Sequence, residues 1–293
     1  MKTTLPARDI ELLAEARHWD PFSVLGPHPA DGRGVAIRVI YPPAAHVHVL
    51  TGSGGKTVRT AMTRIHPCGI FEAVVPGAAG PLRYRLEITN PDGHCWEQDD
   101  PYAVGLVLSD FDVHLLAEGT HLETWRKLGS HRMTIGGIDG VAFAVWAPNA
   151  ERVSVVGNFN HWDGRTHPMR IRGGSGIWEL FVPGLCEGEI YKYEIRARDT
   201  GELFTKADPH GFRFEQPPRT GTIVCEIDGY EWNDSAWLAE RARLDPLAQP
   251  VSVYEVHLGS WKRADGNRYL SYAELAGDLI PYVNGMGYTH LEL

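Results

Sequence analysis

The sequence lacks long apolar runs. None of its 293 residues lie in a stretch that approaches the roughly 20 apolar residues needed to span a bilayer. The N-terminal segment MKTTLPARDIELLAEA has no uninterrupted apolar core, so we do not expect a signal peptide. Cysteine is also scarce, and no pair has CxxC spacing. We therefore predict a cytoplasmic protein with reduced thiols and without a membrane partner.

Positive charge is in deficit. The chain has 28 Lys and Arg against 37 Asp and Glu, and the basic residues are dispersed. A surface that binds nucleic acid needs clustered positive charge, so we exclude nucleic acid as a partner. We also expect a monomer. Aromatic residues are abundant by contrast, with nine Trp. Indole and phenol rings combine an apolar face with a polar edge, which suits both protein cores and sugar-binding surfaces.

The chain contains a long internal repeat. Gly69–Gly77 (GIFEAVVPG) aligns with Gly176–Gly184 (GIWELFVPG), with identity at six of nine positions. The other matches are Tyr84–Ile88 with Tyr191–Ile195, and Asp100–Pro101 with Asp208–Pro209. Solenoid repeats are only about 20–50 residues long, so this longer period indicates two duplicated domains.

Each copy has the pattern of a β domain. Val35–Tyr41 and Val141–Trp146 are short apolar segments, and Pro42 and Pro148 end them because proline cannot donate to a sheet. Short strands separated by Gly, Pro and Asp are typical of β-sandwiches. We therefore predict a mainly β chain with two tandem immunoglobulin-like β-sandwiches. The first module spans residues 1–116 and the second module spans residues 117–229.

Helices are expected only outside the sheets. Asp9–Arg17 predicts a short N-terminal helix. Thr120 and Glu123 have the spacing of a capping box, which predicts a linker helix at His121–Leu128. Ser235–Arg243 predicts a second linker helix.

The last segment changes character. Val251–Leu258 predicts a strand buried on both faces, Tyr272–Asn284 a helix that begins at a capping box, and Thr289–Leu293 another strand. Strand–helix–strand is the βαβ unit of a parallel sheet. A (β/α)8 barrel takes about 250 residues. Residues 230–293 therefore predict a linker helix and the truncated start of such a barrel.

Three segments resemble known families. Val253–Trp261 (VYEVHLGSW) and Gly285–Leu293 (GMGYTHLEL) resemble the first two barrel strands of the α-amylase family, glycoside hydrolase family 13. Gly157–Gly164 (GNFNHWDG) with Gly176–Gly184 resembles the glycogen-binding carbohydrate-binding module family 48. Asp20–Gly26 (DPFSVLG) and the first module resemble the N-terminal domain of bacterial glycogen branching enzymes, whose N-terminal part has all three segments in this order.

The resemblance implies a 1,4-α-glucan branching enzyme, a glycosyltransferase of glycogen biosynthesis. Such enzymes move an α-1,4-glucan segment to a 6-hydroxyl by a retaining mechanism with two carboxylates. The resemblance therefore implies that neither a metal nor an organic cofactor is needed. In this family the carboxylates lie on the fourth and fifth barrel strands, and this chain stops at the second, so we assign no catalytic residue. The alternatives are a stand-alone glycogen-binding or targeting protein, or another family 13 enzyme such as an isoamylase.

An aromatic loop is the leading candidate for contact with α-1,4-glucan or glycogen. Trp162 follows Asn158 and Asn160 in a Gly-bounded loop, so a ring for stacking lies beside groups that bond to hydroxyls. In the resembled module an aromatic residue near this position contacts oligosaccharide. The corresponding loop of the first module, Thr51–Lys56, has neither Trp nor Asn. We therefore expect the first module to be structural or length-sensing.

Three further residues are candidates for glucan contact. Trp178 lies on an expected strand, and its repeat mate Phe71 favours a core role, so a buried and a binding position both stay open. Lys192 is a candidate to assist Trp178 by bonding to a hydroxyl. Trp261 follows the first expected barrel strand, where the loops of such barrels face the active site.

We expect the 293-residue chain alone to be inactive, because the family's catalytic carboxylates lie beyond its last residue. Purified chain incubated with amylose should leave the iodine absorption spectrum unchanged. A spectral shift that indicates new branches would contradict this expectation.

Overall fold

The computed structural model describes residues 3–30, 32, 34–53, 56–77 and 82–293. The chain is mainly β and divides into two compact units, Met1–Gly229 and Tyr230–Leu293. Among the described residues no helix is both long and apolar enough to cross a membrane.

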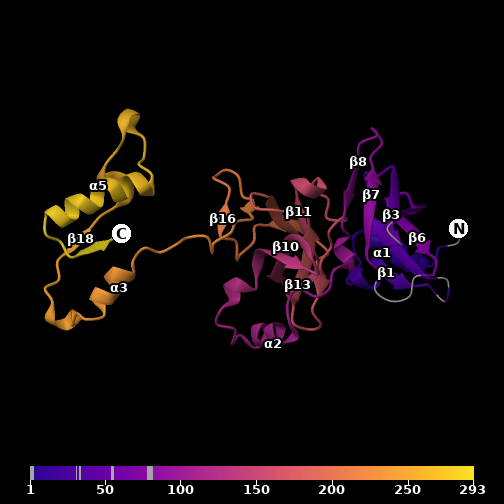
Figure 1. The fold of residues 1–293 in the computed structure, drawn as a ribbon, viewed down its shortest axis with the longest axis horizontal. Coiled ribbons are helices and arrows are strands. Elements are labelled where there is room, and N and C mark those ends of the chain that lie inside the picture. Colours follow the sequence, from indigo (N-terminus) through magenta and orange to yellow (C-terminus); the bar gives the residue numbers. More distant parts are fainter. Residues whose placement is uncertain (1–2, 31, 33, 54–55, 78–81) are drawn as a thin grey trace. The chain divides into compact units, whose positions relative to one another are not determined.

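The first module contains two four-stranded antiparallel sheets, with orders β1-β2-β6-β5 and β4-β3-β7-β8 (Figure 1). The strands are β1 Gly26–Pro29, β2 Val35–Ile40, β3 His46–Ser53, β4 Lys56–Ala61, β5 Thr63–His66, β6 Ile70–Val75, β7 Tyr84–Thr89 and β8 Cys95–Gln98. Ile37 and Phe71 from one sheet share an apolar core with Val49 and Leu86 from the other. The two sheets therefore face each other across this core.

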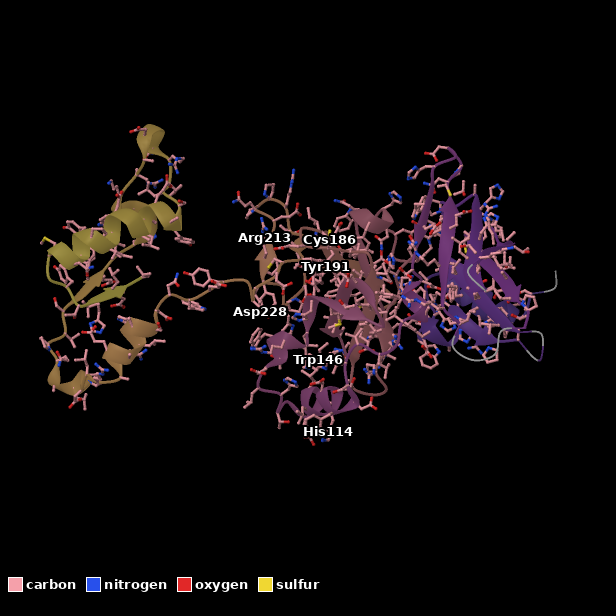
Figure 2. The ribbon with its side chains drawn as sticks, in the orientation of Figure 1. His114, Trp146, Cys186, Tyr191, Arg213 and Asp228 are labelled. Atoms are coloured by element: carbon pink, nitrogen blue, oxygen red, sulfur yellow. The ribbon has the colours of Figure 1, made fainter. Side chains whose placement is uncertain are left out.

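The second module has the same plan, with sheet orders β12-β13-β10-β9 and β11-β14-β17-β16 and with β15 paired to β14. Its strands are β9 Gly129–Ile135, β10 Ile138–Trp146, β11 Ala150–Gly157, β12 Arg170–Ile171, β13 Ile177–Pro183, β14 Ile190–Ala197, β15 Leu203–Lys206, β16 Arg213–Phe214 and β17 Thr222–Ile223. Phe143 of one sheet and Tyr191 of the other meet edge to face, with ring centroids 4.9 Å apart. Figure 2 labels Tyr191 within the second module.

The repeat seen in the sequence corresponds to repeated structure. Gly69 and Gly176 both have positive φ, 91° and 75°. A Cβ at Gly69 would lie 2.5 Å from the Pro42 Cα, and one at Gly176 would lie 2.7 Å from the Pro148 Cβ. Glycine is therefore required at the same point of both modules, where a turn approaches the proline that ends a neighbouring strand.

A buried tyrosine–aspartate bond also occurs in both modules. The Tyr84 hydroxyl donates to the Asp100 carboxylate at 2.6 Å, and the Tyr191 hydroxyl donates to Asp208 at 2.7 Å. The second module adds a further bond, because the Tyr193 hydroxyl donates to the same Asp208 oxygen at 2.9 Å. Both carboxylates are buried.

The linker helix predicted at His121–Leu128 is wrong. That region holds only a 3-10 turn at Thr124–Arg126, and the helix is α2, Asp110–Glu118. Ser109 caps its start by accepting from the Asp112 amide, and left-handed Gly119 ends it. Ser109 and Thr120 each precede an acidic residue by three positions, and the residue that caps a helix is Ser109.

The segment expected to end the first module at residue 116 packs on the second module instead. Val113 and Leu116 of α2 contact the buried cluster that contains Ile177. The buried Glu179 carboxylate accepts from the Leu108 amide at 2.9 Å. Arg172 pairs with the same carboxylate at 2.9 Å, so burial of this charge is compensated.

The second unit contains the expected strand–helix–strand. α3 is Ser235–Arg241, β18 Val253–Glu255, α4 Leu258–Trp261, α5 Tyr272–Gly285 and β19 His290–Glu292. β18 and β19 are parallel, and the predicted capping box of Ser271 and Glu274 is confirmed. The prediction of a strand buried on both faces is wrong here. Val253 and Glu255 of β18 are exposed. The apolar contacts described for this part of the chain lie on the α5 side, where Val256 packs against Leu279 and Val283.

The N-terminal helix is α1, Ala7–Ala14, which begins and ends slightly earlier than the predicted Asp9–Arg17. Pro6 occupies the N-cap position, where its missing amide hydrogen costs nothing. Leu13 is the buried anchor of the helix. A turn follows at Glu15 and Ala16, where Ala16 is left-handed with φ of 53°, and irregular residues lead from there to the 3-10 turn Pro21–Ser23 and the first sheet.

The two tyrosine–aspartate bonds predict unequal effects of the same substitution. Tyr84→Phe leaves Asp100 with one donor fewer and no second tyrosine, and we expect a loss of about 1–3 kcal/mol in unfolding free energy. Tyr191→Phe should cost about 1 kcal/mol or less, because Tyr193 still donates to Asp208. Urea denaturation followed by circular dichroism measures both. The exposed Tyr272→Phe is the control, and equal losses for Tyr84 and Tyr191 would contradict the account.

Candidate carbohydrate-binding site

The loop at Gly157–Thr166, which follows β11, is held from within by one buried side chain. The Asn160 Oδ1 accepts from the Gly157 amide at 2.9 Å. The Asn160 Nδ2 donates to the Val155 carbonyl and to the His167 Nδ1, each at 2.9 Å. Asn160 was predicted to contact glucan, but its carboxamide is buried and committed to these bonds. Its role in this structure is to fix the loop.

His167 supports the loop as a neutral acceptor. Burial lowers its pKa from the usual 6.5 to about 4. The bond from the Asn160 Nδ2 also requires an unprotonated Nδ1, so the geometry and the pKa agree. The Phe159 ring packs edge-on against the imidazole, with centroids 5.6 Å apart.

The loop turns the Trp162 indole outward. His161 and Trp162 both have left-handed backbones, with φ of 55° and 60°, which is uncommon for residues other than glycine. Trp162 is 40% exposed. Its Nε1 donates to the Asn158 Oδ1 at 2.9 Å, so the ring is held in one orientation. The structure thus brings together Trp162 and Asn158, two of the predicted residues.

One side of the loop forms a hollow of about 410 Å³, which we call the Trp162 hollow. It is lined by Trp162, Arg152, Glu194, Arg196 and Leu203, together with Glu15 and Ala16 of the N-terminal segment. Arg152 is buried, and it pairs with Glu194 and donates to the Gly164 carbonyl at 2.8 Å. Its Nε has no hydrogen-bond partner among the described residues.

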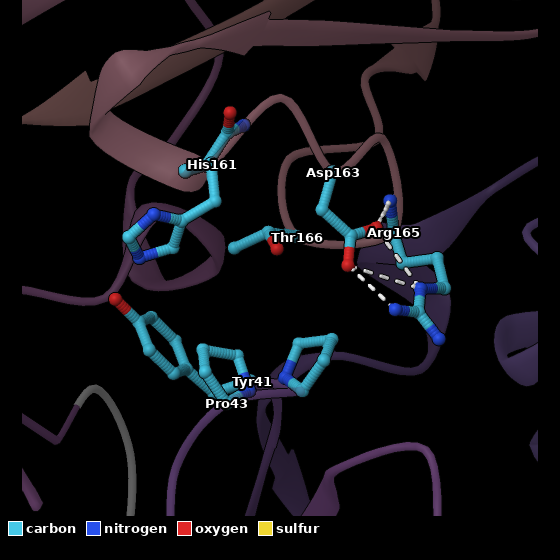
Figure 3. Close-up of a pocket in the computed structure, with 8 residues that line it drawn as sticks. Tyr41, Pro43, His161, Asp163, Arg165 and Thr166 are labelled. Carbon is cyan, nitrogen blue, oxygen red and sulfur yellow. Dashed lines mark hydrogen bonds and ion pairs between the residues drawn. The ribbon is translucent and has the colours of Figure 1, made fainter. Parts of the chain in front are cut away.

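The other side of the loop forms a second hollow of about 410 Å³, which we call the Tyr41 hollow. Figure 3 shows Tyr41 and Pro43 of the first module facing His161 of the loop, with Asp163 and Arg165 farther along. The Arg165 Nη2 lies 2.6 Å from the Asp163 Oδ2. Burial opposes ionisation of Asp163, but the bonds from Arg165 outweigh it and lower the pKa of that carboxyl.

Trp178 does not fit its prediction as a glucan contact. It lies in the core between the sheets and is 1% exposed. Its Nε1 donates to the Ala147 carbonyl at 3.1 Å. The comparison with its buried repeat mate Phe71 favoured this position, and no face of the indole is open to a sugar.

Lys192 lies on the outer side of its sheet, away from the buried Trp178. On β14 it alternates with Tyr191 and Tyr193, which enter the core, so it points to the outer side of the sheet. Glu194 and Arg196 share that outer side and line the Trp162 hollow. The Lys192 Nζ donates to the Thr220 Oγ1 at 2.6 Å.

Trp261 lies in the second unit, at the end of α4. Its ring is half-buried and packs 5.8 Å from Tyr282, and its Nε1 donates to the Tyr254 hydroxyl at 3.2 Å. Within that unit it joins the small core around Val256.

Sequence patterns missed Arg152 and Tyr41. Alternation with Val153 and Val155 places Arg152 on the outer side of β11, where an arginine is ordinarily solvated. The loop buries it: a Cβ on Gly164 would lie 1.9 Å from the Glu194 Oε1 and 3.0 Å from the Arg152 Nη1. No local signal in the sequence predicts that closure.

Two family models match the chain. Carbohydrate-binding module 48 (isoamylase N-terminal domain) matches residues 127–211, and the N-terminal domain of the alpha-1,4-glucan branching enzyme GlgB matches residues 6–102. The match to carbohydrate-binding module 48 contains the whole of the loop, together with Glu194, which pairs with Arg152, and Glu179, which pairs with Arg172. These matches define a protein that carries a carbohydrate-binding module of family 48.

Curated relatives extend the similarity to almost the whole chain. The 1,4-alpha-glucan branching enzyme GlgB of Roseobacter denitrificans is 51% identical over 287 residues, which are 97% of this chain and 39% of that protein. The same enzyme of Rhodospirillum rubrum is 49% identical over 290 residues, 97% of this chain and 39% of that protein. The chain belongs to the GlgB branching-enzyme family, of which it is an N-terminal portion that spans about two fifths of those relatives' length.

Solved structures are more distant. A type I pullulanase from Bacillus subtilis, solved with maltose, aligns with 91% of this chain and 36% of its own, at 18% identity and a TM-score of 0.43. Nothing about this chain follows from a likeness of that degree.

The neutral state of His167 predicts a dependence of stability on pH. The folded protein binds this proton less readily than the unfolded chain, so the contribution of His167 is complete above pH 6.5 and is lost as pH falls toward 4. The loss should be about 3 kcal/mol. Denaturation of wild type and His167→Gln across this range measures it, with the exposed His114→Gln as control. Parallel pH profiles for wild type and His167→Gln would contradict it.

Proposed function

We propose that this chain binds α-1,4-glucan for a branching enzyme, which transfers a glucan segment to a 6-hydroxyl during glycogen biosynthesis. The observation that carries the proposal is the fixed, outward indole of Trp162 at the edge of a hollow lined by charged side chains. It lies within the residues matched by carbohydrate-binding module 48. The named relatives are branching enzymes, which disfavours an isoamylase or a stand-alone targeting protein.

The chemistry of the Trp162 hollow suits a sugar chain. An exposed indole offers an apolar face to the C–H side of a pyranose ring. The Asn158 Oδ1 is occupied by Trp162, which leaves its amide nitrogen to donate to a hydroxyl. Glu194 and Arg196 add an acceptor and donors on the wall, and Lys192 extends this face beyond them.

Further features of the chain are part of the same proposal. Both modules are immunoglobulin-like sandwiches, and their boundary lies near Ala103 rather than at residue 116, because α2 packs on the second module. The parallel β18–α5–β19 unit begins a catalytic (β/α)8 barrel, where Trp261 would follow the first strand. We retain the expectations of a cytoplasmic monomer and of glucan contact by Trp261.

Trp162→Ala should weaken binding to glycogen about tenfold, which corresponds to about 1.4 kcal/mol, because the stacking face is lost. Affinity electrophoresis of the 293-residue chain in gels containing glycogen measures the dissociation constant. Asn158→Ala should weaken binding several-fold by releasing the indole.

The matched control is Trp237→Ala, because Trp237 is 58% exposed and lies in the second unit. Unchanged retardation of Trp162→Ala, with wild type retarded, would place binding on another surface. Absence of retardation for wild type would sink the proposed function.

A further inference from the structure

A third hollow of about 380 Å³ opens beside the N-terminal segment, and we call it the Trp19 hollow. It is lined by Trp19, Asp20 and Phe22 of the first module, by Leu106, and by Arg170 and Gly173 of the second. Its volume falls in the range of about 300–1,000 Å³ that is usual for ligand sites. Nothing in the Trp162 loop contributes to it.

The floor of this hollow is rigid. The Arg170 guanidinium lies 3.4 Å from the centre of the Phe22 ring. Its Nη2 donates to the Val104 and Gly105 carbonyls at 3.1 and 2.7 Å. The Phe22 ring in turn meets Tyr102 edge to face at 5.0 Å. These groups are committed to one another, so the floor presents a fixed shape to any ligand.

The rim of the hollow carries groups without protein partners. Trp19 is 60% exposed. The neighbouring Asp20 side chain accepts no hydrogen bond and forms no ion pair with the residues that the structure describes. Its backbone is nevertheless fixed, because the Asp20 amide donates to the Nδ1 of the buried His18 at 3.3 Å. An exposed indole therefore stands beside a half-buried carboxylate that makes no hydrogen bond within the described part of the chain.

We infer that Trp19 and Asp20 form a second contact for α-1,4-glucan, separate from the Trp162 loop. The Trp19 indole stacks on a sugar ring. The Asp20 carboxylate accepts hydrogen bonds from sugar hydroxyls, and these bonds are strong because the acceptor is charged. The ligand class rests on the proposed function. The location of the site rests on the Trp19 hollow and on the Trp19 and Asp20 side chains at its rim.

The N-terminal segment connects this hollow with the first site. Glu15 and Ala16 line the Trp162 hollow, and Trp19 and Asp20 line the Trp19 hollow. Between them, Ala16 and His18 line a small cavity of about 10 Å³ against the second module. Residues of the one short segment Glu15–Asp20 thus line all three.

This continuity makes a bridging ligand reasonable. A glucan long enough to reach from Trp162 to Trp19 binds at both, and the first contact raises the effective concentration of sugar at the second, so two weak contacts combine into one firm attachment. The first module then takes part in binding through Trp19, although its own Thr51–Lys56 hairpin lacks the aromatic residue.

Glycogen binding by six proteins tests the inference: wild type, Trp19→Ala, Asp20→Asn, Trp162→Ala, the Trp19→Ala/Trp162→Ala double variant, and the Trp237→Ala control. Affinity electrophoresis should show Trp19→Ala about tenfold weaker than wild type. Trp162→Ala should keep residual binding that the double variant loses. Asp20→Asn should weaken binding several-fold, since its carboxylate supports no bond within the fold.

The outcomes separate the two proposals. Trp19→Ala that binds as tightly as Trp237→Ala would overturn the second contact while leaving the proposed function intact, provided that Trp162→Ala is weakened. Weakening by Trp19→Ala but not by Trp162→Ala supports the second contact and moves the main site to it. No binding by wild type overturns both.

Fluorine NMR supplies a readout that does not depend on the variants' affinity. In chain labelled with 5-fluorotryptophan, the resonance missing from the Trp19→Ala spectrum belongs to Trp19. Addition of maltoheptaose should shift that resonance and leave the Trp237 resonance in place. A Trp19 resonance that stays fixed at saturating maltoheptaose would contradict the inference, and the remaining signals of Trp19→Ala show whether the variant is folded.

Discussion

The Asn160 carboxamide is the interaction on which the surface of the second module depends. It bonds to both ends of the loop, at Val155 and Gly157 before it and at His167 after it. The left-handed turn at His161 and Trp162 and the burial of Arg152 beneath Gly164 follow from this closure. A hollow opens on each side of the loop Gly157–Thr166, which we therefore call the ridge.

The two modules share a plan but not a surface. The required glycines, Gly69 and Gly176, and the tyrosine–aspartate bonds recur in both, so duplication has preserved the devices that close the core. The ridge belongs to the second module alone. The first module instead contributes the N-terminal segment Glu15–Asp20, whose residues line the Trp162 hollow, the small cavity beside it and the Trp19 hollow. The binding surface that we propose is therefore built by both modules together.

Much of this could be predicted from the sequence. The repeat, the β character of both modules, the parallel strand–helix–strand and the pairing of Trp162 with Asn158 all depend on local patterns, and the structure contains them. The family assignment depended on short motifs and is borne out by relatives about half identical over the chain. The helix α2 was missed because Thr120 offered a capping spacing as good as the true cap, Ser109.

The remaining features depend on contacts between distant residues. Asn160 and Trp178 are of residue types that commonly contact sugars. Only the fold shows that Asn160 closes the loop and that Trp178 fills the core. Trp19 gave no signal, because its neighbours in space, Leu106 and Arg170, are far away in sequence. Lys192 was chosen for the wrong reason, since strand alternation puts it on the face of the Trp162 hollow rather than beside Trp178.

The central claim is that α-glucan binds along the ridge and the N-terminal segment. A crystal structure of the 293-residue chain with maltoheptaose tests it most directly. The account predicts a sugar ring stacked on the Trp162 indole, with a hydroxyl within hydrogen-bonding distance of Asn158 or Glu194. Ordered sugar found only on surfaces remote from Trp162 and Trp19 would contradict it.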